Sequence, residues 1–222
     1  MFAATVFDLD ETLVDSAATW QRVIGAVAAR HGHPWTREDW FSIQGTSTEH
    51  WGAYLARRCR DLTPERAVAE CVDGMVAATE SRRFWPLPGA GELVATAAAL
   101  GPVGLVSASP RRYVEAAVTA FGFAPLLGSV VTGDDVTRGK PAPDPYLLAA
   151  DRLGVAPARC VAVEDSASGI RSAHAAGMTV LAVPNATTVL DFAAMALADH
   201  QAADAQIATK TLLALARPGS ST

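Results

Sequence analysis

The sequence predicts an α/β protein with a Rossmann-like core, a parallel sheet flanked by helices, and an all-helical cap domain inserted into that core. Short apolar runs alternate with helical stretches along most of the chain, which is typical of a parallel sheet. One long segment, from about residue 15 to residue 85, has helical patterns but no strand-like run. The 222 residues are 50% hydrophobic and 18% charged, which indicates a folded globular chain with a sizeable core.

The runs that we expect to form the sheet are short and rich in valine and alanine. They are residues 3–7, 103–106, 129–131, 160–163 and 179–183. Helical stretches separate most of these runs, so the strands should lie parallel, with helices covering both faces of the sheet.

The helices between the strands have recognisable ends. Ser109 and Pro110 predict the start of a helix that ends at Gly122, because serine caps helices and proline suits their first turn. By the same signals, a second helix should span residues 144–154 and a third residues 166–177.

The strand-free segment carries apolar residues at helical spacing from Trp20 onward. Thr46 and Glu49 predict a capping box ahead of one helix, and Thr63, followed by proline, predicts the start of another. The chain returns through prolines and a glycine at residues 86–89, a connection suited to a hinge. We therefore assign residues 1–14 and 86–222 to the α/β catalytic core and residues 15–85 to the cap domain.

Charge and composition exclude several classes of protein. The formal net charge is −5 and no basic stripe is present, so we expect no nucleic-acid partner. No apolar run approaches the roughly 18 residues of a membrane span, and the N-terminus lacks a basic secretion signal. Cys59, Cys71 and Cys160 are scattered, so we expect buried thiols in a reducing cytoplasm rather than a zinc site. We expect a cytoplasmic monomer.

Two carboxylates directly follow the first predicted strand, in the stretch from Val6 to Asp15. Asp8 and Asp10 are two residues apart, which places both side chains on one side of an extended backbone. Two like charges there are costly unless a cation holds them, and ligands of open α/β sheets bind at this end of the strands. Taken alone, the pair fits a helix-capping turn equally well.

Three further polar groups follow other predicted strands. Ser107 comes after the second strand, Lys140 after the third, and Glu164 with Asp165 after the fourth. Taken alone, each has a common structural explanation. A serine after a strand often caps a helix or a turn, a loop lysine is usually solvated, and an acidic pair often complements a helix dipole. Together they should lie at one edge of one sheet, which is far more specific than any single group.

This combination of residue types suits phosphoryl transfer. Clustered carboxylates favour a hard cation with oxygen ligands, magnesium rather than zinc. A lysine and a hydroxyl can hold phosphate oxygens. One carboxylate can attack phosphorus, and a second can protonate the leaving oxygen and then activate water.

The chain resembles the haloacid dehalogenase superfamily, in its phosphatase and phosphomutase branch with a small helical cap. The resemblance rests on four motifs that occur in the family's order and spans essentially the whole chain. These motifs are Asp8-x-Asp10-x-Thr12, Ser107, Lys140 and Glu164-Asp165. In one departure, Glu11 stands where many members have glycine, and we expect a changed loop conformation at most.

The resemblance implies a role for each motif residue. Asp8 is the nucleophile, and Asp10 is the general acid and base. Ser107 and Lys140 hold the phosphoryl oxygens, and Lys140 also offsets the charge of Asp8. Thr12 orients the catalytic loop.

The resemblance also implies the metal ligands and places the remaining substrate contacts. Asp8 and Asp165 bind Mg²⁺ through their side chains and Asp10 through its backbone carbonyl, while Glu164 contacts the metal directly or through water. We add two candidates for substrate binding: Ala108, next to the motif serine, and Trp20, in the first cap helix.

The resemblance leaves several functions to weigh. A magnesium-dependent phosphatase acting on a small phosphate monoester through an aspartyl phosphate fits best. A β-phosphoglucomutase-like enzyme is the alternative. Such mutases carry a histidine in the first cap helix and an arginine in the cap loop. Here Trp20 stands at about the position of that histidine, and the loop of residues 45–49 has no arginine. A dehalogenase is disfavoured, because dehalogenases of the family lack the acid that corresponds to Asp10. A non-catalytic binding protein is disfavoured too, because it would need neither the nucleophile nor the acid.

Within the phosphatases, several stretches are similar to the sugar-phosphate and hexitol-phosphate members, 2-deoxyglucose-6-phosphatases among them. They include residues 15–20, 86–89, 104–110 and 161–166. The resemblance implies a sugar phosphate as substrate. Trp20 is the residue that we expect to stack on the sugar, although its helical spacing also fits a role in the cap core.

Overall fold

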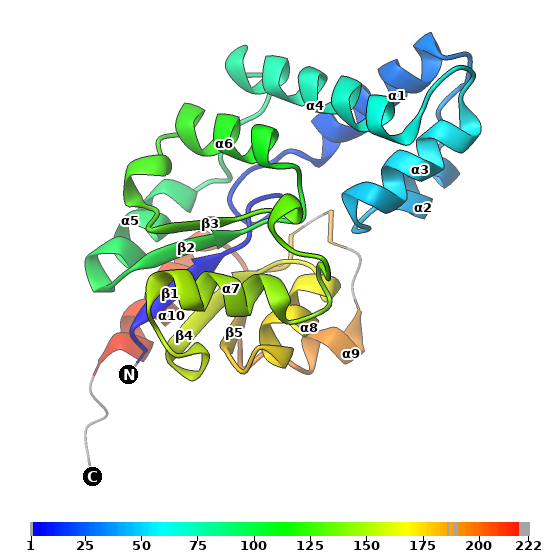
Figure 1. Cartoon of the computed structure of the whole chain (residues 1–222). Helices are drawn as coiled ribbons and strands as arrows, with labels where there is room; N and C mark the ends of the chain where they lie inside the picture. The colour runs from blue at the N-terminus through cyan, green and yellow to red at the C-terminus, as the bar shows by residue number, and fades with distance from the viewer. Residues whose placement is uncertain (1, 186, 189–190, 218–222) are drawn as a thin grey trace.

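The computed structural model describes residues 2–185, 187–188 and 191–217, and it forms a parallel sheet covered by helices on both faces, with a group of helices beside it (Figure 1). The six strands lie in the order β3-β2-β1-β4-β5-β6, and all neighbouring pairs are parallel. The strands are β1 (Ala4–Phe7), β2 (Val103–Val106), β3 (Ser129–Val131), β4 (Cys160–Glu164), β5 (Thr179–Ala182) and β6 (His200–Gln201). The five predicted strands are confirmed, and β6 is an additional short edge strand.

Successive strand residues point to opposite faces of the sheet and so build two buried clusters. Phe7 and Leu105 pack on one face with the helices α5 (Ala90–Leu100) and α10 (Ala205–Ala216). Val6 packs on the other face. There it joins α7 (Asp144–Leu153), α8 (Ala167–Ala175) and α9 (Phe192–Met195). The central strands are therefore buried on both sides, as expected for a parallel sheet.

Four helices fill the segment between β1 and α5. They are α1 (Ala17–Arg30), α2 (Arg37–Ile43), α3 (Thr48–Arg58) and α4 (Pro64–Glu80). Figure 1 shows them side by side above the carboxyl ends of the strands, next to α6 (Arg111–Ala120). The chain leaves and re-enters the sheet region at one place, because Val14 and Pro86 form an isolated antiparallel bridge. None of the described helices is long and apolar enough to cross a membrane.

Two of the predicted helix starts are wrong. The N-cap of α6 is Pro110, with no side-chain cap, because the Ser109 hydroxyl instead donates to Asp10. The N-cap of α3 is Ser47, whose hydroxyl accepts from the backbone of His50, while the Thr46 hydroxyl donates to the preceding turn.

The other helix signals are confirmed. Thr63 caps α4, and Ser166 caps α8. Gly154 ends α7 with a left-handed backbone, a conformation that glycine adopts without steric cost. The short 3₁₀ turns Ala124–Leu126, Gly133–Asp135 and Pro157–Arg159 connect the remaining elements.

Candidate active site

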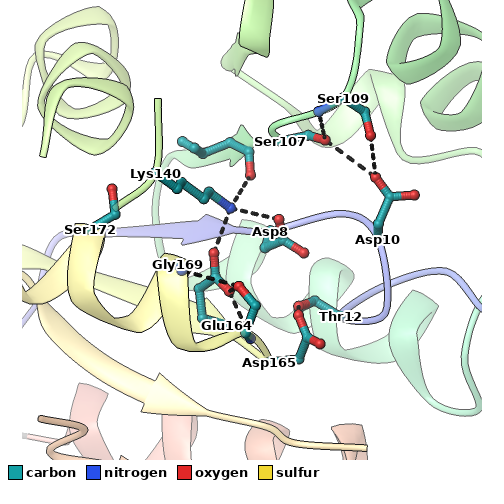
Figure 2. Close-up of polar contacts among 12 residues, drawn as sticks. Asp8, Asp10, Thr12, Ser107, Ser109, Lys140, Glu164, Asp165, Gly169 and Ser172 are labelled. Atoms are coloured by element: carbon teal, nitrogen blue, oxygen red, sulfur yellow. Dashed lines mark hydrogen bonds and ion pairs between the residues drawn. The ribbon is translucent and has the colours of Figure 1, made fainter. Parts of the chain in front are cut away.

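The predicted motif residues converge at the carboxyl edge of the sheet (Figure 2). Asp8 directly follows β1, Ser107 follows β2, and Glu164 is the last residue of β4. Lys140 reaches them from the connection between β3 and α7. Four segments that are far apart in the sequence thus supply one cluster, because the ends of parallel neighbouring strands meet at one edge.

Lys140 is the centre of this cluster. Its ammonium nitrogen lies 2.7 Å from Oδ1 of Asp8, 2.5 Å from Oε1 of Glu164 and 3.1 Å from the carbonyl oxygen of Val106. Only 5% of the side chain is exposed. Burial alone would lower the pKa of Lys140, but the two carboxylates outweigh it and raise that pKa, so the amine stays charged.

The carboxylates outnumber the cations at this site. Burial raises the pKa of Asp8 to about 7; Lys140 opposes this shift and Glu164 adds to it. Burial, reinforced by Asp8 and Glu164, also raises the pKa of Asp165 well above its usual range. Carboxylate oxygens of Asp8, Glu164 and Asp165 lie within 4.8 Å of one another. An all-oxygen donor set that is short of positive charge fits a hard divalent cation.

Glu164 is fully buried, and both of its carboxylate oxygens already accept hydrogen bonds. Oε1 accepts from Lys140 and from the Tyr146 hydroxyl at 2.7 Å, while Oε2 accepts from the backbone and hydroxyl of Ser166 at 3.2 and 3.0 Å. A Cβ at Gly169 would lie 1.8 Å from Oε1, so only glycine leaves room for this carboxylate. Glu164 is therefore fixed in place and in turn fixes Lys140.

Asp10 faces away from Lys140 in the structure and toward α6 and the first cap helix. Its Oδ1 accepts hydrogen bonds from Ser16 at 2.6 Å, from the Tyr113 hydroxyl at 2.7 Å and from the Trp20 indole at 3.3 Å. Its Oδ2 accepts from Ser109 at 2.8 Å and Ser107 at 3.4 Å (Figure 2). The side chain is thus held by donors from both the sheet region and the cap segment.

Several of these partners were missed in the sequence. Ser109 has a signal, because it stands two residues after Ser107 in the same turn. Tyr113 has none: it lies in an ordinary amphipathic pattern, and only the packing of α6 brings its hydroxyl to Asp10. Tyr146, on α7, is likewise recognisable only from the fold.

Trp20 lies at the predicted place beside the site, but it is largely covered. Its side chain packs edge-to-face against Trp51 and Tyr113, with ring centroids at 6.1 and 5.1 Å, and the residue is 9% exposed. It also lines the cavity above Asp8. Little of the Trp20 side chain is therefore left uncovered to contact a sugar.

Thr12 and Glu11 both tie the catalytic loop to its surroundings. The Thr12 hydroxyl donates to Asp165 at 3.2 Å, which accords with a loop-orienting role. Glu11 adopts φ 65°, the left-handed conformation that glycine favours. Its carboxylate accepts from the backbone of Ser16 and Ala17, both at 2.8 Å, and caps α1 in place of a conventional N-cap side chain.

A loop after β5 completes the surroundings of the metal-binding candidates. The Thr188 hydroxyl donates to Asp165 at 3.2 Å, the Thr187 hydroxyl to the Glu11 carboxylate at 2.6 Å, and the Asn185 amide to the Glu11 carbonyl at 2.5 Å. No motif marks this loop in the sequence, so its approach to the site was not predicted.

A cavity of about 210 Å³ opens at this edge of the sheet. Asp8, Asp10, Lys140 and Asp165 form its floor, and Ala108 lines it as well. Side chains of α1, α2 and α3 close the opposite side. They are Trp20, Ile24, Trp40, Ile43 and Trp51, with the polar residues Gln44 and Thr46 in the turn after α2.

Comparisons with known proteins agree with this geometry. The sequence profile of the haloacid dehalogenase-like hydrolases matches residues 2–177. The chain belongs to this family. Validoxylamine A 7'-phosphate phosphatase of Streptomyces hygroscopicus subsp. limoneus is 32% identical over 90% of this chain and 92% of its own length. Hexitol phosphatase A of Escherichia coli K12 is 37% identical over 80% of this chain and 81% of its own.

A solved structure of the family has the same fold. The crystal structure of CbbY from Rhodobacter sphaeroides in complex with phosphate superposes with a TM-score of 0.83 and 27% identity. The match covers 92% of this chain and 95% of that chain. The family resemblance and the α/β fold expected from the motifs are therefore confirmed.

Proposed function

We propose that the protein is a Mg²⁺-dependent phosphatase that hydrolyses a small sugar phosphate through a phosphorylated Asp8. The observation that carries the proposal is the buried ammonium of Lys140 between Asp8 and Glu164, next to Asp165. This arrangement supplies a nucleophile, a cation for phosphate oxygens and an all-oxygen metal site at one point. Phosphatases acting on sugar-related esters among the relatives support the same activity.

In the first step, Asp8 attacks the phosphorus atom. Lys140 donates to Oδ1 of Asp8 and holds the carboxylate in place for this attack. The phosphoryl oxygens are held by Lys140 and the Ser107 hydroxyl. The bond from phosphorus to the leaving oxygen breaks, and Asp10 gives that oxygen a proton.

In the second step, Asp10 takes a proton from water, which attacks the aspartyl phosphate and releases phosphate and the free Asp8 carboxylate. Both steps need an Asp10 carboxyl oxygen within hydrogen-bond reach of the leaving oxygen or the attacking water, whereas in the structure these oxygens accept from Ser109 and Tyr113. Asp10 must therefore exchange these partners for the substrate during turnover.

The metal site is part of the proposal. Asp8 and Asp165 would hold Mg²⁺ through their side chains and Asp10 through its backbone carbonyl. Of the two contacts expected for Glu164, direct or through water, the four hydrogen bonds that its carboxylate already accepts favour the one through water. The cation would neutralise charge on the phosphoryl group as the bonds change. Thr12 and Thr188, which donate to Asp165, would keep its oxygens in place.

A phosphomutase is the second candidate, since it would use the same nucleophile and acid. It must grip a second phosphate while the intermediate turns over, and the loop of residues 45–49 offers no arginine for that purpose. Hydrolysis is therefore favoured.

We also propose a cap domain bounded at residues 15 and 85, a monomeric state and a cytoplasmic location.

A phosphate-release screen over a panel of sugar phosphates, with and without Mg²⁺, tests the proposal. We expect turnover of at least one sugar phosphate that a chelator abolishes and that is absent in Asp8→Asn. Interconversion of glucose 1-phosphate and glucose 6-phosphate without phosphate release would identify a mutase instead. Release that persists undiminished in Asp8→Asn would refute the assignment of the nucleophile.

A further inference from the structure

The cap side of the active-site cavity offers a substrate aromatic surface and uncharged polar groups. Trp40 and Trp51 supply ring surface, and Ile43 supplies aliphatic surface. Gln44 and Thr46 also line this wall. The Gln44 amide nitrogen and the Thr46 hydroxyl already donate to main-chain carbonyls, so their oxygens are left to accept hydrogen bonds from substrate hydroxyl groups. Such a wall matches a molecule with an apolar C–H face and several hydroxyl groups.

A second cavity of about 310 Å³ adjoins the first and shares Thr46 and Ala108 with it. The Thr48 hydroxyl, which belongs to the lining of the second cavity, donates to the carbonyl of Ala108 at 3.3 Å. The second cavity is also lined by hydroxyl groups, Thr137 among them, and by one cap carboxylate, Glu49. A leaving group that extends beyond the first cavity thus meets hydroxyls and a negative charge.

The charges around both cavities are almost all negative. In the part of the chain that the structure describes, neither an arginine nor a histidine lines either cavity, and Lys140 is the one cationic side chain. Lys140 is already paired with Asp8 and Glu164. A cation bound at Asp8 and Asp165 would add positive charge only at the floor, where the transferring phosphoryl group lies.

From this distribution we infer that the enzyme selects monoesters whose leaving group is a neutral polyol or sugar without a second phosphate. The inference rests on the proposed function and adds the substrate class. In the first cavity, a second phosphate would have to give up water next to aromatic rings with no unpaired cation to compensate, which is costly. In the second cavity it would stay hydrated, but it would meet the exposed Glu49 carboxylate with no unpaired cation to offset the repulsion. We expect kcat/KM for a bisphosphate to be at least about 100-fold below that for the matching monophosphate.

The experiment compares two esters of one carbon skeleton. The best hexose or hexitol monophosphate from the screen is assayed for phosphate release beside the bisphosphate of the same skeleton, at equal free Mg²⁺. A bisphosphate turned over within tenfold of the monophosphate, or a bisphosphate as the best substrate of the screen, overturns the inference. Absence of release from every ester, p-nitrophenyl phosphate included, would refute the proposed function itself and is therefore a distinct result.

A cation placed on the cap side of the cavity tests whether the lack of positive charge there is what excludes a second phosphate. Thr46→Arg should raise the ratio of bisphosphate to monophosphate kcat/KM by at least about tenfold, and the uncharged Thr46→Met should not. Gln44→Arg, at the same wall, repeats the test if Thr46→Arg melts at a lower temperature than Thr46→Met. Ratios that are equal in the arginine and methionine variants would show that charge at this wall does not select the substrate.

Discussion

Replacing Lys140 with alanine should slow the chemical step and not merely weaken binding. The change removes the donor at 2.7 Å from Asp8 and 2.5 Å from Glu164 and leaves two buried carboxylates without their cation. Removing a donor of this kind from a developing charge typically costs about 10²–10³-fold in kcat. A further loss follows because the pKa of Asp8, already about 7, rises without the opposing charge of Lys140, so less carboxylate is present at neutral pH.

The assay is steady-state phosphate release with the best sugar phosphate, together with a thermal melt. An unpaired buried charge costs about 3–5 kcal/mol in stability, so kinetics must be measured well below the melting temperature of the variant. Lys210→Ala is the matched control, because Lys210 is exposed on α10. If Lys140→Ala raises KM and leaves kcat unchanged, Lys140 only binds substrate and the reasoning fails.

Other substitutions test separate parts of the account. Asp10→Asn should lower kcat by about 10²–10⁴-fold while Mg²⁺ binding, measured by calorimetry, is largely kept; a loss below about tenfold would mean that another group moves the proton. Trp20→Ala should raise the barrier for a good sugar phosphate by about 1–3 kcal/mol and affect p-nitrophenyl phosphate much less, whereas equal losses with a lowered Tm would make Trp20 a cap-core residue. The pKa of Asp135 offers a test of stability. Burial alone would raise this pKa, but hydrogen bonds from Arg152 and Thr132 outweigh burial and lower it from 3.8 to about 2. Because this folded-state pKa is depressed, the stability that Asp135 supplies is present above about pH 4 and is lost as the pH falls toward 2. Asp135→Asn should thus cost about 1–2 kcal/mol in urea unfolding at pH 7 and almost nothing near pH 2, and a pH-independent difference would refute the pairing.

The sheet and the motif residues could be predicted because their signals are local. The strands are short, valine-rich runs that alternate with helices with recognisable ends, and this alternation predicts a parallel sheet. A polar residue directly after such a strand falls at the carboxyl edge of the sheet by topology alone. Asp8, Ser107 and Asp165 follow their strands in this way, whereas Lys140 lies nine residues beyond β3 and was placed by its motif. The short strand β6 was not, since two residues carry no periodic pattern.

The environment of Asp10 could not be predicted, because it depends on tertiary packing. Ser109 fitted a helix cap equally well, and the structure uses its hydroxyl for Asp10 instead. Tyr113 reaches Asp10 only through the position of α6, and Trp20 through the position of α1. For Thr46, a cap was wrongly predicted because Ser47, one residue later, is an equally good N-cap.

Covalent phosphorylation of Asp8 is the central claim, and acid quenching tests it most directly. The enzyme is mixed with its sugar phosphate and Mg²⁺, quenched within the first turnover, digested and analysed by mass spectrometry, in parallel with chelator-treated enzyme and Asp8→Asn. We predict a phosphorylated peptide that contains Asp8 in the complete reaction and in neither control. Turnover at full rate in Asp8→Asn, or phosphate on another residue of the quenched enzyme, would contradict the account.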